Sequence, residues 1–285
     1  MTTGAADSRP VPKSATVPLL GAGAPRAAVA ALGRLVRRAV EQVGVNGRYL
    51  ADSARAVADV GTWRPLVVTQ ARRLGVDSLP IALFIALFTG IVLALLASYS
   101  FTRAVPLYFV GTLVEKTLTM ELAPVLTGLA LAGRVGANIA AELGTMAVTE
   151  QVDALETLAY DPHAYLVVPR VFAGTVMFPL VVGLAMVVGV AAGWGASTQL
   201  LSLSTEQFFK GARLFFAFFD VEYGLVKAAS FGFAVTLIGC RAGMTTRGGA
   251  EGVGRSATRA VVYSCITILV LDAFWAVVWL LGRAP

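Results

Sequence analysis

The chain has 285 residues, of which 57% are hydrophobic and 14% are charged, whereas soluble globular proteins carry about a quarter charged residues. This composition, with a mean hydropathy of +0.75, excludes a disordered protein, a disulfide scaffold and a soluble enzyme with a thin apolar core. The net charge of +6 lies entirely in residues 1–78, which hold 11 Lys and Arg against 5 Asp and Glu. That asymmetry indicates a membrane protein with a cytoplasmic N-terminus, and it does not indicate nucleic-acid binding.

The N-terminal region is predicted to have two parts. Residues 1–25 are rich in Ala, Gly, Pro and Ser without periodicity and predict a disordered tail. No basic segment followed by an apolar one opens the chain, so we expect no cleavable signal peptide. Residues 26–78 predict basic amphipathic helices on the anionic cytoplasmic leaflet. Their apolar positions recur every three or four residues between arginines: Val29, Leu32, Val36, Val40 and Val43, then Trp63, Leu66, Val67 and Ala71.

Residues 79–285 predict an all-α domain of five transmembrane helices. Apolar segments long enough to cross about 30 Å of hydrocarbon occur at about 79–99, 106–133, 166–200, 223–240 and 260–281. Five spans place the C-terminus outside, and the third is long enough to tilt or bend at Pro179. The loops agree with this topology, because the predicted cytoplasmic segment 241–259 carries four arginines against Glu251 alone. The outer segment Ser204–Tyr223 is rich in Phe and predicts a short interfacial helix.

Spacings of small residues predict close contacts between helices. Gly189 and Gly193 are four residues apart, as are Gly239 and Gly243. Such pairs allow two membrane helices to approach closely.

The sequence offers little material for catalysis. Cys240 and Cys265 lie in apolar surroundings and predict two buried thiols, and His163, the only histidine, is expected at the surface. Neither a His-based metal cluster nor a Ser-His-Asp triad can be assembled from these residues. The segment Gly249–Ser256 resembles a phosphate-binding loop, but it has Arg255 where Lys is needed and follows an apolar span instead of a strand. We therefore expect no nucleotide, cofactor or metal on this chain.

Three ionisable residues fall inside the predicted spans: Glu121, Lys227 and Asp272. A charge at the centre of a membrane helix costs about 2.5–3.5 kcal/mol on insertion scales, so each should face a cavity or a partner. Lys227 and Asp272 could neutralise each other as a buried pair. For Glu121 two interpretations stay open, one in which it lines a transport path and one in which it makes a structural ion pair.

The segment 133–162 predicts a short helix between the second and third spans. Thr149 is a candidate cap, Val152, Leu155 and Ala159 form an apolar stripe, and Asp161-Pro162 ends the helix. Glu150, Asp153 and Glu156 lie on the other face. This helix is either a solvated loop helix or a surface that a cytoplasmic partner covers.

Several motifs in order resemble the MlaE/YrbE permease family, whose members are membrane subunits of ABC transporters that work with MCE proteins to move lipids between membranes. The similarity covers about residues 60–283. Its motifs are Leu122-Ala-Pro-Val, Leu131-Ala-Gly-Arg-Val-Gly-Ala, Ala140-Ala-Glu-Leu-Gly-Thr-Met, Thr149-Glu-Gln-Val-Asp-Ala-Leu, Asp161-Pro, Arg259-Ala-Val-Val-Tyr-Ser and Leu271-Asp272. Family members often have Arg before the Glu of the second span, where this chain has Met120.

The resemblance implies a homodimer in the bacterial inner membrane with a lipid path between protomers. It implies as partners an ATP-binding ABC subunit that carries the ATP, an MCE-domain protein outside, a STAS-domain accessory subunit and membrane lipids. The implied coupling helix contains Glu150, Gln151, Asp153, Leu155, Glu156 and Leu158. The lipid-path candidates are Glu121, Met120, Leu122, Lys227 and Asp272.

Two other classes of function are considered. An ion-coupled secondary transporter or channel could use Glu121, Lys227 and Asp272 as a relay, although paired inverted repeats are absent from the sequence. A membrane-embedded lipid-modifying enzyme would need a convergent nucleophile, base and metal ligands, and the sequence offers none.

Overall fold

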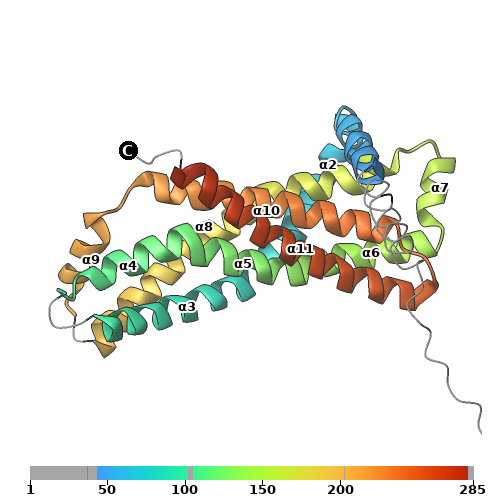
Figure 1. The fold of residues 1–285 in the computed structure, drawn as a ribbon. Coiled ribbons are helices and arrows are strands. Elements are labelled where there is room, and N and C mark those ends of the chain that lie inside the picture. Colours follow the sequence, from blue (N-terminus) through green and yellow to red (C-terminus); the bar gives the residue numbers. More distant parts are fainter. Residues whose placement is uncertain (1–36, 38–43, 102–104, 202, 282–285) are drawn as a thin grey trace, which may run out of the picture. The chain divides into compact units, whose positions relative to one another are not determined.

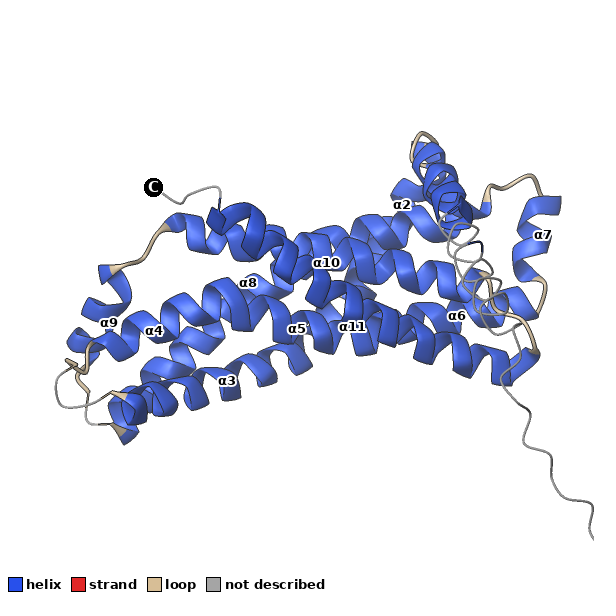
Figure 2. Ribbon diagram, viewed as in Figure 1, coloured by secondary structure: helices blue, strands red, loops and turns tan. Residues whose placement is uncertain are grey.

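The computed structural model describes residues 37, 44–101, 105–201 and 203–281. All regular elements within these residues are helical (Figure 2), in agreement with the predicted all-α fold. The chain divides into two compact units, residues 1–50 and 51–285, and the architecture described below is that of the second. The predicted tail and, apart from residue 37, the first part of the predicted basic helices at residues 26–43 lie outside the described residues, and residues 44–56 are helical.

The second unit is a bundle of long helices joined by short turns (Figure 1). Its α-helices are α2 (Val60–Leu74), α3 (Leu79–Ser100), α4 (Phe109–Thr117), α5 (Ala123–Leu131), α6 (Ala137–Val148), α7 (Gln151–Thr157), α8 (Val168–Leu200), α9 (Thr205–Leu214), α10 (Phe218–Met244) and α11 (Gly249–Leu281). A 3₁₀ turn, η1 (Val76–Ser78), links α2 to α3. Three π-helical segments, η2 (Leu118–Leu122), η3 (Ala132–Gly136) and η4 (His163–Val167), interrupt or precede the α-helices.

Five helical runs among the described residues are long and apolar enough to cross a membrane, which confirms the predicted number of spans. Several run past the predicted ends: the second covers Phe109–Val148 and the fifth starts at Gly249. The predicted limits were set where charged residues begin. Backbone hydrogen bonds continue through such residues, so η3 and α6 carry the second helical run past residue 133. Pro179 lies inside α8, which continues through it.

The helices pack in the order α3, α8, α10 and α11, with α6 against both α10 and α11. Glycines mark the closest crossings. A Cβ at Gly90 of α3 would collide with the backbone of Gly189 in α8, and one at Gly232 would collide with that of Gly174. Gly193 also lies against Gly90. The prediction of close contact at the small-residue pairs is therefore confirmed for α8, and Gly239 and Gly243 of α10 likewise lie against α6 and η3.

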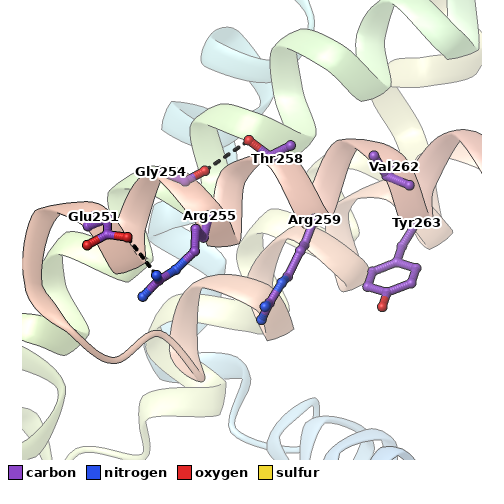
Figure 3. A pocket seen from close by; sticks show the side chains of 7 residues that line it. All are labelled: Glu251, Gly254, Arg255, Thr258, Arg259, Val262 and Tyr263. Atoms are coloured by element: carbon purple, nitrogen blue, oxygen red, sulfur yellow. Dashed lines mark hydrogen bonds and ion pairs between the residues drawn. The ribbon is translucent and has the colours of Figure 1, made fainter. Parts of the chain in front are cut away.

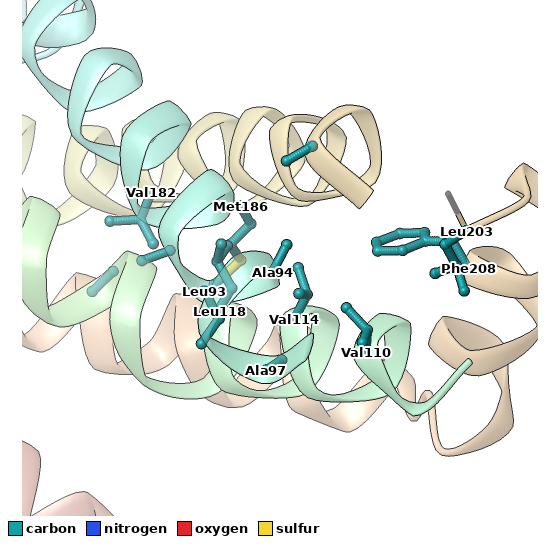
Figure 4. Packing of buried hydrophobic residues seen from close by; sticks show 13 residues of the cluster. Leu93, Ala94, Ala97, Val110, Val114, Leu118, Val182, Met186, Leu203 and Phe208 are labelled. Atoms are coloured by element: carbon teal, nitrogen blue, oxygen red, sulfur yellow. The ribbon is translucent and has the colours of Figure 1, made fainter. Parts of the chain in front are cut away.

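An apolar cluster fixes the positions of α3, α4, η2 and α8 relative to one another (Figure 4). Leu93 and Ala97 of α3 meet Val114 of α4, Leu118 of η2 and Met186 of α8. These side chains are buried without a charged group among them. The cluster therefore anchors η2, the segment that carries Glu121.

Two short helices occupy opposite ends of the bundle (Figure 1). At one end, called the α9 end below, α9 packs on α4 and is capped by reciprocal hydrogen bonds between Ser204 and Gln207. At the other end, called the α7 end, α7 stands across the end of α6. The predicted helix in the segment Ser204–Tyr223 is thus confirmed as a helix.

The cysteines and the histidine are placed partly as expected. Cys240 is buried and Cys265 is half-buried, and both are free thiols. His163 is half-buried, and its Nδ1 lies 3.1 Å from the Ser53 hydroxyl. The prediction of a surface histidine is therefore confirmed only in part.

Candidate functional site

A cluster of three ionisable side chains lies inside the bundle, where α10, α11 and η2 meet. Lys227 of α10 is fully buried, and its Nζ lies 2.7 Å from Glu121 Oε2 and 2.5 Å from Asp272 Oδ1. The predicted pair of Lys227 and Asp272 is therefore confirmed. Sequence reasoning missed that Glu121 joins the same cation, since nothing in the spacing of three distant spans states which helices face each other.

The π-helical segment η2 explains how the backbone contributes to this cluster. Pro124 has no N–H, so it cannot donate the α-helical hydrogen bond that Met120 O would otherwise accept. Lys227 Nζ donates to Met120 O over 3.2 Å. Lys227 thus donates a hydrogen bond to the backbone of η2 and is also the counter-ion of the two carboxylates. Short π-helical segments within α-helices are frequent at functional sites.

Aromatic rings enclose the cluster on the side toward the α9 end. The Lys227 ammonium lies 4.9 Å from the centre of the Tyr223 ring, a cation–π contact. Trp279 packs on Tyr223 at 5.1 Å and on Phe219 at 4.7 Å. Trp275 donates to the Ser230 hydroxyl at 3.0 Å. These rings shield the ammonium from water on that side.

The two carboxylates are more open than the lysine between them. The Glu121 side chain is 41% exposed and that of Asp272 is 24% exposed, whereas Lys227 is at 0%. Met120 and Leu122 beside Glu121 are half-buried, and Leu122 packs against the apolar cluster. The cluster therefore has one cation and two anions, and its two carboxylates are the groups that are partly exposed.

A second charged group lies nearer the α9 end. Lys116 Nζ is 2.9 Å from Asp220 Oδ2 and 3.1 Å from Phe215 O. The neighbouring Glu115 is buried, and Thr119 donates to its Oε1 at 3.4 Å. This group ties α4 to the start of α10 and explains how Glu115 and Lys116 are accommodated within the second span.

The short helix α7 is exposed along its length. It has no buried residue, and Val152 and Leu155 are half-buried. Glu150, with φ of 60°, precedes the helix, and Ala159, with φ of 61°, follows it. The left-handed conformation is rare for residues other than Gly. At Glu150 it turns α7 away from the direction of α6, and at Ala159 it turns the chain again after α7.

The predicted details of this helix need three corrections. Thr149 does not cap it, because its hydroxyl donates back to Thr145 O at 2.8 Å. Ala159 does not extend the apolar stripe, since α7 ends at Thr157. Asp161-Pro162 does not end the helix for the same reason. Beyond the helix, Leu158 is 69% exposed. The apolar surface available at this end is thus Val152, Leu155 and Leu158, flanked by Glu150, Asp153 and Glu156, all exposed.

Comparison with known proteins decides between the predicted classes. A family model described as "Permease MlaE" matches residues 67–278. The chain belongs to the MlaE permease family. It is 39% identical over 239 residues to a probable ABC transporter permease protein of Rickettsia typhi, covering 84% of this chain and 92% of that protein. It is 42% identical over 212 residues to one of Synechocystis, covering 74% and 80%.

A further MlaE relative carries a more specific name. The chain is 32% identical over 248 residues to the "Intermembrane phospholipid transport system permease protein MlaE" of Haemophilus influenzae, with coverage of 86% of this chain and 94% of the other. These relatives are named as permeases, which are transport components and not catalysts. Together with five apolar helices, the family fits a multi-pass inner-membrane protein.

In this MlaE permease the segment that resembles a phosphate-binding loop is part of a helix (Figure 3). Gly249 to Ser256 form the first turns of α11 and follow the helix α10, so the strand–loop–helix setting of a phosphate-binding loop is missing. Arg255 pairs with Glu251 at 2.7 Å. An open groove of about 610 Å³ on this helix is lined by Arg255, Arg259 and Tyr263, among others. The chain turns before this helix, at residues 245–248.

Proposed function

We propose that this chain is the permease subunit of an ABC transporter that moves phospholipids between the bacterial inner membrane and the outer envelope, with ATP hydrolysis on a separate subunit. The observation that carries the proposal is the match to the MlaE permease family over residues 67–278. The name of the Haemophilus influenzae relative supports a phospholipid as the substrate. An ion-coupled transporter using the same charge cluster is disfavoured because the relatives are ABC transporter permeases.

The α7 end is proposed to face the cytoplasm, which puts the N-terminus inside and the C-terminus outside. Arg241, Arg247, Arg255 and Arg259 belong to this end of α10 and α11, whereas the α9 end balances Lys210 and Arg213 with Glu206 and Glu222. Positive residues concentrate on the cytoplasmic side of membrane proteins. On this topology α2 lies on the cytoplasmic leaflet.

The partners follow from that orientation. The ATPase subunit docks on α7 through Val152, Leu155 and Leu158, and the charged side chains beside them, Glu150, Gln151, Asp153 and Glu156, set its position. A second copy of the chain completes the lipid path between protomers. The MCE-domain protein binds at the α9 end, and a STAS-domain subunit accompanies the ATPase.

One continuous helical run connects the docking helix to the charge cluster. The run Phe109–Val148 reaches from Glu121 to the start of α7 and contains η2 and η3. ATP-driven movement of α7 therefore reaches Glu121 through α6 and α5. The half-exposed carboxylates of Glu121 and Asp272 line the path, with Met120 and Leu122 beside them, and Lys227 holds them in place.

The proposal is tested by purifying the tagged chain from native membranes in mild detergent and identifying the proteins and lipids that accompany it. We expect a P-loop ATPase, an MCE-domain protein and bound phospholipid. Reconstituted complex should then transfer labelled phospholipid only with hydrolysable ATP. Transfer driven by a proton gradient without an ATPase would instead support the ion-coupled transporter.

Glu121→Gln is expected to lower ATP-dependent lipid transfer about tenfold, because one charge-assisted hydrogen bond is worth roughly 1.5–3 kcal/mol. Lys227 keeps Asp272 as its counter-ion, so the complex should assemble normally. Transfer between reconstituted vesicles measures the effect, with Asp59→Asn, an exposed carboxylate at the start of α2, as the control. Unchanged transfer would assign Glu121 a structural role only.

A further inference from the structure

A polar cavity lies outside the charge cluster, between the α2–η1 corner and the helix formed by η3 and α6. Its volume is about 420 Å³, within the range of roughly 300–1,000 Å³ found for small-ligand sites. The lining residues that bear on its chemistry are Gln70, Arg73, Asp77, Arg134, Asn138 and Glu142. Two cations, two anions and two amides therefore surround one space.

Buried contacts fix part of this wall. Arg170 of α8 is only 3% exposed, and its Nη2 lies 3.0 Å from Glu142 Oε1 while its Nη1 donates to Leu166 O at 2.7 Å. Arg134 Nη1 donates to the Ser78 hydroxyl at 2.7 Å and to Asp77 O. Glu142 is thus held by the buried Arg170, and Arg134 is held by Asp77 and Ser78 of the same cavity wall.

Other polar groups in the wall are available to a ligand. Arg73 Nη1 is 3.5 Å from Glu142 Oε1, at the limit of a hydrogen bond, and its side chain is 58% exposed. Exposed ion pairs of this kind hold weakly. The amides of Gln70 and Asn138 make no side-chain hydrogen bond with the part of the chain that the structure describes. These donors can turn toward a bound anion.

The cavity lies at the depth of the lipid head groups. The apolar helix α3 begins at Leu79 and has 22 residues, enough to cross about 30 Å of hydrocarbon. Asp77 and Ser78, the residues that Arg134 contacts, come directly before it. The cavity therefore opens where α3 enters the membrane, at the α7 end of the bundle.

We propose that this cavity binds the head group of a zwitterionic phospholipid of the inner leaflet, the phosphate on Arg73 and Arg134 and the ammonium group on Glu142. The planar donor fork of Arg matches a phosphate. The two carboxylates disfavour a free phosphate ion and favour a head group that also carries a cation. The assignment to the inner leaflet rests on the proposed function. In that setting the cavity is a loading site beneath the interfacial helix α2, separate from Glu121.

The test uses the full chain in nanodiscs, with a photo-crosslinking amino acid in place of Gln70, and measures captured phosphatidylethanolamine. Capture at position 70 should fall about tenfold with Arg73→Gln, the effect of losing a charge-assisted hydrogen bond. Arg72→Gln, a change of equal charge at the next residue and outside the cavity, should leave capture unchanged. A second probe at Val68, exposed on the same helix, should capture lipid independently of Arg73.

Three results would overturn the proposal. These are equal capture in the Arg72→Gln and Arg73→Gln variants, equal capture of phosphatidylglycerol and phosphatidylethanolamine, and loss of capture in millimolar inorganic phosphate, which would identify a free-phosphate site. The same preparations are assayed for the co-purifying ATPase. If the ATPase is retained while capture is independent of Arg73, only the cavity assignment fails. If the unmodified chain yields no ATPase, the proposed function fails independently.

Discussion

Lys227→Met is expected to destabilise the protein by roughly 3–5 kcal/mol, the cost of removing one partner from a buried ion pair. The change removes the cation that lies within 2.7 Å of both Glu121 and Asp272. Two carboxylates, one in η2 and one in α11, would then remain without that counter-ion. The hydrogen bond from Lys227 Nζ to Met120 O is lost as well. We expect a large fall in the thermal unfolding temperature of the purified protein, together with loss of lipid transfer.

A neutral version of the cluster separates folding from transport. In the triple variant Lys227→Met, Glu121→Gln and Asp272→Asn no charge is left unpaired, so stability should largely return. Lipid transfer should stay low if the carboxylates line the path. Lys210→Met, at an exposed position of α9, controls for the loss of a lysine. A wild-type unfolding temperature in Lys227→Met would contradict the ion-pair geometry, and full transfer in the triple variant would exclude a transport role for the charges.

The number of membrane-spanning helices could be predicted from the sequence, because the hydropathy of a 20-residue segment shows whether it can cross a membrane. The ends of the helices could not, as η3 and α6 show. Arg134 and Glu142 lower the hydropathy there, but they bind Ser78 and Arg170 and stay within the helical run. Hydropathy registers the charge of these residues and not the partner that neutralises it.

The sequence predicted individual site residues but not all of the contacts between them. An ionisable group inside a span requires a partner, and this argument found Glu121, Lys227 and Asp272 and one of their two pairs. The second pair depends on how α10 and η2 pack, which one sequence does not state. The cavity near Arg73 was missed for a related reason. Its residues lie at the ends of apolar segments, where charged side chains are expected and attract no attention.

Replacing Glu150, Asp153 and Leu155 together with Ala is expected to reduce ATPase binding at least tenfold without affecting membrane insertion. A change of tenfold needs about 1.4 kcal/mol, and single interface residues often exceed this when truncated. Stability should be spared because α7 contains no buried residue. Recovery of the ATPase with the tagged chain, compared with the amount of chain in the membrane, measures the effect.

A matched variant at the other end of the bundle tests the topology in the same experiment. Glu206, Lys210 and Leu214 lie exposed on α9, also a short helix, and their replacement with Ala removes a similar set of side chains. This variant should retain the ATPase. If it loses the ATPase while the α7 variant keeps it, the α9 end faces the cytoplasm and the proposed orientation is inverted. If neither variant affects binding, the ATPase docks elsewhere, and the exposed apolar residues of α7 need a different partner.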